Sequence, residues 1–269
     1  MNNNDELYIG WQSRAPNETA RLMRKIVAAL AIVAVALSIF VSQSQQTIGK
    51  ALFEWGKTKA FSGVLKLQPY PHLQVPRPGQ AVGFSSYYLV APFKFGLDTE
   101  KLTAFADKEV SLMGTLIYRG NQTMIEARPE SIQPVRNSTN QSEVAAHSSF
   151  PATESQIGEV PTRQTGRQTF QGEIVDSKCF LGVMNPGQLA PHRACAVRCI
   201  SGGIPPVLLV RRTDAPPLYF LLVSSEGRPV NKEVLDMVAE PVEVMGEVAK
   251  EGELLILRAD PATFRRLRR

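Results

Sequence analysis

The chain of 269 residues is long enough for about two domains of ordinary size. Its hydrophobic share of 43% and charged share of 20% are typical of packed domains and exclude a wholly disordered chain. The net charge of +5 is modest, and the basic residues do not alternate with aromatic ones, so we expect no nucleic-acid partner. Part of the charge lies in the basic tail at residues 265–269. We expect this tail either to contact an anionic surface or an acidic partner or to be solvated.

The N-terminal region predicts a membrane anchor. Residues 1–20 are polar and form the expected tail, and Arg21, Arg24 and Lys25 then precede an apolar run at residues 26–41. A helix of this run reaches roughly 24 Å, slightly less than the ~30 Å hydrocarbon core. The flanking cations can extend to the interface, so residues 21–44 form the predicted span. The positive-inside rule places the N-terminus in the cytoplasm and everything after residue 45 across the membrane.

Two other interpretations of this region stay open. A cleaved signal peptide could use Ser42 and Ser44 as its small residues, although about 25 residues precede the apolar run. A buried soluble helix is the third, but the run has no polar face. Farther along, Ile48, Leu52 and Trp55 share one helical face, which predicts a short helix within residues 46–61, either at the membrane interface or packed on the first barrel.

An internal repeat sets the domain organisation. Residues 87–132 match residues 219–264 at a constant offset of 132, which aligns Met113-Gly114 with Met245-Gly246. Upstream, residues 61–63 match residues 170–172 at an offset of 109, so the second copy carries 23 extra residues after its first strand. The pattern of each copy predicts two strands, one short helix and a β-hairpin.

The predicted fold is therefore mainly β, with an N-terminal transmembrane helix followed by two repeated small OB-like β-barrels, each with a short helix. The barrels occupy residues 45–132 and 169–264. Residues 133–168 are rich in Ser, Thr, Asn, Gln and Pro and predict a flexible linker. A ferredoxin-like or other α+β sandwich is the alternative fold.

The extra residues of the second copy hold the chemically richest segment of the chain. It contains all three cysteines in the pattern Asp176-x2-Cys179-x12-His192-x2-Cys195-x3-Cys199. Pro191 can open a helix here and Gly202-Gly203 can close it. On that helix the histidine and the last two cysteines fall on one face, within reach of Cys179.

Three interpretations of this segment compete. A disulfide from Cys179 to Cys195 or Cys199 would pin the insertion to the barrel, and on this favoured interpretation no cofactor is expected. A metal site would use Cys179, His192, Cys195 and Cys199, with Asp176 as a further candidate, and would suit zinc, copper or an iron–sulfur centre. A reactive thiol would have its pKa lowered by His192 or Arg193. The first copy has no cysteine, so a barrel can form without the cluster.

The string GEIVDSKC…HRACAVRCISGGIPPVLL, followed by VEVMGEV, resembles a widespread group of exported bacterial domains. These domains have a G-x-V-x-D-x-x-C start, a C-x-x-x-C helix followed by glycine, and then a small OB-like barrel. The resemblance covers residues 170–259 and carries over five motif positions: Asp176, Cys179, Cys195, Cys199 and Gly203. The group has no established activity, so the resemblance implies a fold and an exported location.

No phosphate-binding loop, zinc-protease, nucleophile-elbow or haem-attachment motif occurs in the sequence, and no catalytic residue is predicted. We therefore expect a non-enzymatic, single-pass protein of the bacterial inner membrane with both barrels in the periplasm. It would contact lipid through residues 26–41 and protein partners through its barrels, as an interaction module or accessory subunit of a membrane complex, such as a redox complex. The alternative is a metal-binding or electron-handling domain centred on the Cys/His cluster.

Overall fold

The computed structural model describes residues 16–46, 51–77, 83–120, 122–135, 166–213, 215–251 and 254–267. The chain divides into two units, residues 1–49 and residues 50–269. Most of the predicted tail at residues 1–20 and of the linker at residues 133–168 lies outside the described residues.

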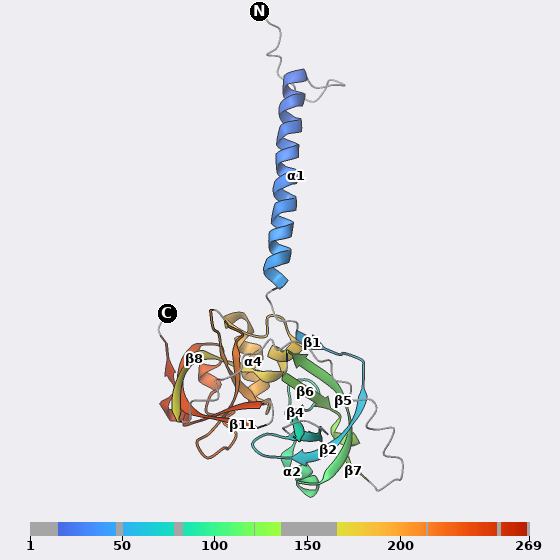
Figure 1. Cartoon of the computed structure of the whole chain (residues 1–269), viewed down its shortest axis with the longest axis vertical. Coiled ribbons are helices and arrows are strands. Elements are labelled where there is room, and N and C mark those ends of the chain that lie inside the picture. The colour runs from blue at the N-terminus through green and yellow to red at the C-terminus, as the bar shows by residue number, and fades with distance from the viewer. Residues whose placement is uncertain are drawn as a thin grey trace, which may run out of the picture. The chain divides into compact units, whose positions relative to one another are not determined.

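The first unit contains the long helix α1 (Asn17–Gln46), drawn in blue in Figure 1. Residues 17–43 of this helix are long and apolar enough to cross a membrane, and the most apolar part is not buried in the protein. A signal sequence near an N-terminus has the same character. Among the predicted flanking cations, Arg21 pairs with Glu18 at 3.2 Å, Arg24 bonds the carbonyl of Ala20, and Lys25 is exposed.

The first barrel closes through five strands: β2 (Lys59–Lys66), β3 (His72–Pro76), β4 (Phe84–Val90), β5 (Glu109–Arg119) and β6 (Gln122–Ala127). Strands β5, β2, β3 and β4 are antiparallel neighbours in that order. Strand β6 closes the barrel because it pairs parallel to β4 and antiparallel to β5. Three short elements decorate this barrel: β1 (Ala51–Phe53) and β7 (Gln133–Pro134) on β5, and η2 (Pro129–Ser131). Helix α2 (Thr99–Leu102) and the 3-10 turn η1 (Thr103–Phe105) connect β4 to β5.

The second barrel repeats this topology with β8 (Arg167–Asp176), β9 (Pro206–Val210), β10 (Leu218–Val223), β11 (Pro241–Glu251) and β12 (Leu254–Ala259). Its short elements are η6 (Leu235–Met237), η7 (Pro261–Thr263) and β13 (Arg265–Arg266). The register confirms both offsets of the repeat, because Gly63 lies opposite Val110 and Gly172 lies opposite Val242.

The mainly β architecture is confirmed, with two five-stranded barrels that each carry a short helix. Each copy has one strand more than the sequence predicted, because β3 and β9 were missed. The predicted helix within residues 46–61 is wrong in its described part: residues 51–53 form β1 and residues 59–66 belong to β2. Leu52 and Phe53 pair instead with Tyr118 and Ile117 on β5, where strand pairing outweighs the helical spacing.

Among the described residues, buried side chains form three hydrophobic clusters. One fills the first barrel, around Leu65, Leu89 and Leu112, and another fills the second barrel. The third lies between the barrels and joins Tyr88 of the first to Tyr219 of the second. Cys179, Phe180 and Cys199 of the insertion belong to this third cluster. The insertion is therefore part of the hydrophobic contact that makes the two barrels one compact unit.

Candidate metal centre

The insertion lies between β8 and β9 and folds into three short elements. A turn of π-helix, η4 (Cys179–Val183), follows β8, and a 3-10 turn, η5 (Ala190–His192), leads into helix α4 (Arg193–Ser201). Pro191 lies in η5, directly before α4, and Gly202 ends the helix, as the sequence predicts for its end. Gly203 has a φ of +98°, a left-handed conformation that favours glycine.

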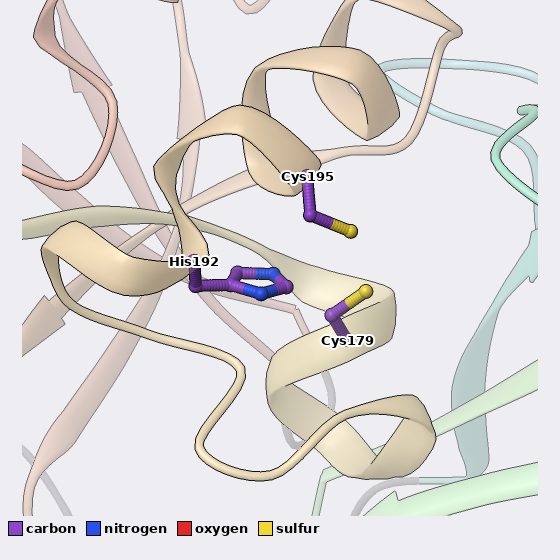
Figure 2. Close-up of side chains that lie close together, drawn as sticks. All are labelled: Cys179, His192 and Cys195. Carbon is purple, nitrogen blue, oxygen red and sulfur yellow. The ribbon is translucent and has the colours of Figure 1, made fainter.

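The fold brings the predicted cluster together at the start of η4, at the end of η5 and along α4. The ligand atoms of Cys179, His192 and Cys195 all lie within 4.8 Å of one another (Figure 2). Cys199 and Asp176 form a second group with Cys179, within the same limit. Cys179, Cys199 and His192 are buried, whereas Cys195 is partly exposed.

Asp176 is fully buried and orients two of these candidate ligands. Its Oδ1 accepts the backbone N–H of Cys179 at 2.8 Å, and its Oδ2 lies 2.8 Å from Nε2 of His192. An ionised carboxylate only accepts hydrogen bonds, so the proton of a neutral His192 belongs on Nε2 and the lone pair on Nδ1. Metal-binding histidines commonly give their other N–H to a carboxylate in this way. Asp176, predicted as a further ligand, therefore fits better as the group that positions Cys179 and His192.

The cysteine sulfur atoms have a spacing that suits a shared ion. Cys179 Sγ and Cys199 Sγ are 4.0 Å apart, and all three cysteines are free thiols. A tetrahedral ion with metal–sulfur bonds of ~2.3 Å separates two sulfurs by roughly 3.8 Å. A disulfide needs a sulfur–sulfur distance of about 2.05 Å, so the predicted disulfide is not formed in this structure.

The buried thiols of Cys179 and Cys199 interact directly with each other. Their mutual hydrogen bond and burial raise the pKa of Cys179 well above the ordinary thiol value. The same hydrogen bond lowers the pKa of Cys199, and the positive charge of Lys94 acts in the same direction. The two sulfurs therefore share a hydrogen-bonded proton, and a bound metal ion would replace that proton.

Two further residues contact Cys195, and neither was singled out from the sequence. The ammonium group of Lys94, in the β4–α2 loop of the first barrel, lies 2.9 Å from Cys195 Sγ, and this hydrogen bond raises the pKa of Lys94. The thioether Sδ of Met184 lies 3.6 Å from the same sulfur. Arg193, predicted to activate a thiol, instead pairs with Glu240.

Lys178, next to Cys179, has a structural role that the sequence did not reveal. Only 1% of its surface is exposed, and its buried ammonium group binds groups of the first barrel. It donates to the carbonyls of Ala91 (2.9 Å) and Phe93 (2.7 Å) and pairs with Glu126 at 2.5 Å. These contacts compensate the cost of burying a charge and hold the loop that carries Lys94.

No protein-family model matches the chain, and no curated protein is similar to it in sequence. The resemblance of residues 170–259 to exported bacterial domains therefore rests on the motif alone. The structure itself shows that the second barrel carries a buried Cys/His cluster.

Proposed function

We propose that the protein binds a thiophilic transition-metal ion between its two barrels through Cys179, His192 and Cys195, with a fourth ligand position that Cys199, the neighbour of Cys179, could fill. One observation carries this proposal: the ligand atoms of Cys179, His192 and Cys195 lie within 4.8 Å of one another. The contact between Asp176 and Nε2 of His192 supports it, because metal-binding histidines commonly give one ring N–H to a carboxylate. The alternative function from the sequence is thus the one that the geometry supports best.

The surroundings of the cluster suit a charged ligand set. Three thiolates and a neutral imidazole around a divalent ion leave one net negative charge, and Lys94 lies against Cys195 to offset it. Cys179 and Cys199 lie in the hydrophobic contact between the barrels, so the ion would tie the insertion to that contact. The cysteine-free first barrel closes through the same strand order, and the ion would not be needed to form a barrel.

The membrane anchor, the periplasmic location and the accessory-subunit hypothesis stay predictions of the sequence. Under the proposal they would combine as a metal-binding domain tethered outside the bacterial inner membrane. The N-terminal apolar helix is compatible with this tether and equally with a signal sequence.

Metal content and thiol accessibility together test the proposal. The full chain, purified in mild detergent without chelator, is expected to hold about one transition-metal ion and to resist thiol alkylation until a strong chelator is added. The Cys179→Ser variant, which keeps the side-chain size, should lose the ion. A different result would instead establish the predicted disulfide: no stoichiometric metal, and two thiols that can be alkylated only after a reductant is added.

A further inference from the structure

Met184 is an exposed residue whose sulfur is nevertheless placed against the cluster. It follows η4 directly, and its backbone N–H bonds the carbonyl of Cys179 at 3.2 Å, which fixes the main chain at this point. The residue is 44% exposed, so burial does not explain the position of its side chain. Its Sδ nevertheless lies 3.6 Å from Cys195 Sγ.

The site has a buried side and a solvent side. Cys179 and Cys199 are 3% and 1% exposed and form the buried side. Cys195 is partly exposed and, with Met184, forms the solvent side, from which an ion would enter. Cys195 and Met184 both offer sulfur, so an entering ion would meet soft ligands there, beside the ammonium group of Lys94 that contacts Cys195.

The remaining donors are also soft or intermediate. The carboxylate of Asp176 already uses one oxygen for the Cys179 N–H and the other for His192. The set that faces the ion is then thiolate, imidazole and thioether. Zinc in proteins takes thiolate, imidazole and carboxylate ligands, whereas a thioether beside thiolates is typical of monovalent copper.

From this arrangement we infer that the ion is Cu(I) and that the Met184 thioether, on the solvent side of the site, takes the fourth ligand position in place of Cys199. The inference rests on the proposed function, because it names the ion for the same cysteines and histidine. Binding involves no electron transfer: copper enters and stays as Cu(I), Cu–S bonds form, and the protons of the protonated thiols leave to solvent.

Affinity measurements on the full chain in detergent, reduced and kept free of oxygen, test this inference. Cu(I) is titrated against a chromophoric Cu(I) chelator, and Zn(II) is titrated separately against a fluorescent zinc chelator. The Met184→Leu variant, a swap of similar volume, should raise the Kd for Cu(I) about tenfold and leave the Kd for Zn(II) unchanged. The matched control is Met245→Leu: Met245 is 45% exposed on β11, and its replacement should change neither Kd.

Two results would overturn the inference while the proposed function stands. One is that the native chain binds Zn(II) or Cu(I) but the Met184→Leu substitution leaves the Kd for Cu(I) unchanged. The other is an equal loss of affinity for both ions in that variant, which indicates a structural role for Met184. Failure of the native chain to bind either ion would instead remove the proposed function, and the inference with it. Circular dichroism of each variant confirms that the barrels are folded.

Discussion

Asp176 is the residue on which the geometry of the cluster depends. Its two oxygens have separate partners, the backbone of Cys179 and the ring of His192, and both partners belong to the candidate site. In the first barrel the offset of 109 places Leu67 at the equivalent position. A barrel therefore forms without a carboxyl group here, and the buried carboxyl group of Asp176 is better explained by the cluster than by the fold.

Replacing Asp176 by Asn tests this role. An amide of the same shape can still accept the Cys179 N–H, but its NH₂ group would face Nε2 of His192. That contact favours the tautomer with the proton on Nδ1, which removes the lone pair meant for the metal. We expect the Asp176→Asn variant to bind its ion roughly 10 to 100 times more weakly, as for other groups that orient metal ligands.

Asp260→Asn is the control for this substitution. Asp260 is exposed and accepts the backbone N–H of Ala262, a role that asparagine performs equally well. Metal affinity should not change in this variant. Equal affinities in the Asp176→Asn variant and the native chain would show that Asp176 does not position His192 for binding.

At the scale of elements, the loop between β4 and α2 completes the site from the first barrel. Lys178 holds the carbonyls of Ala91 and Phe93, and Lys94 reaches Cys195. The backbone N–H of Gly96 bonds the carbonyl of Gly202 at 2.9 Å. The loop is thus attached to the insertion at its start, middle and end.

Gly202 permits the closest part of this approach. A Cβ built on Gly202 would lie 2.1 Å from the carbonyl oxygen of Lys94, although the φ of −81° is accessible to any residue. Gly202→Ala should therefore act by displacing the loop, and we expect it to lower the free energy of unfolding by about 1 to 3 kcal/mol. Thermal unfolding followed by circular dichroism measures the change.

Gly83→Ala provides the comparison, because a Cβ on the exposed Gly83 would meet nothing within 4 Å. Its melting temperature should match that of the native chain. If the Gly202→Ala variant has the same melting temperature as the native chain, the loop can move away without loss of stability. The close contact would then contribute little to the free energy of unfolding.

The elements also show what a single sequence can predict. Adding the offset of 132 to the bounds of β5 and β6 gives the bounds of β11 and β12. This part of the fold was predictable because each hairpin is specified by its own alternating residues. Strands β3 and β9 were missed because residues 72–76 are short and end in Pro76, and residues 206–210 form an apolar run without alternation.

The candidate site was predictable only where its residues are near in sequence. His192, Cys195 and Cys199 share a helical face, and Cys179 lies on the adjoining turn, so spacing alone brings them together. Lys94 is 101 residues from Cys195, and neither residue carries a local pattern that points to the other. Contacts of this kind depend on how the two barrels pack, which no periodicity encodes.

At the scale of the whole unit of residues 50–269, equivalent positions of the two copies meet in one contact. Cys179 aligns with Tyr70 at the offset of 109, and both belong to the cluster between the barrels. The Tyr70 hydroxyl accepts the backbone N–H of Val230 at 3.1 Å and lies 3.4 Å from the carbonyl of Leu222. Burial raises the pKa of Tyr70, so this hydroxyl stays protonated at neutral pH. The first copy thus uses a tyrosine where the second uses a cysteine.

Glu251 adds a pH-dependent part to this contact. Its carboxylate lies 3.5 Å from Nε2 of His72 and accepts a hydrogen bond from Gln74, both on β3. The interaction with His72, assisted by Gln74 and the charge of Lys66, lowers the pKa of Glu251 below its usual 4.5, against the opposing effect of burial. Tyr88 also interacts with Glu251, and its raised pKa keeps it neutral.

Because the pKa of Glu251 is lower in the folded state, its ionised form stabilises the fold. This contribution is complete above pH 4.5 and is lost as the pH falls below that value through the folded-state pKa. The Glu251→Gln variant should therefore melt below the native chain at pH 7, and the gap should shrink as the buffer is taken below pH 4.5. Glu130→Gln, at an exposed position, should melt with the native chain at every pH. If the difference in melting temperature between Glu251→Gln and the native chain does not change with pH, it is caused by the shape of the side chain. Only the loss of an ionised group can make this difference follow the titration of Glu251.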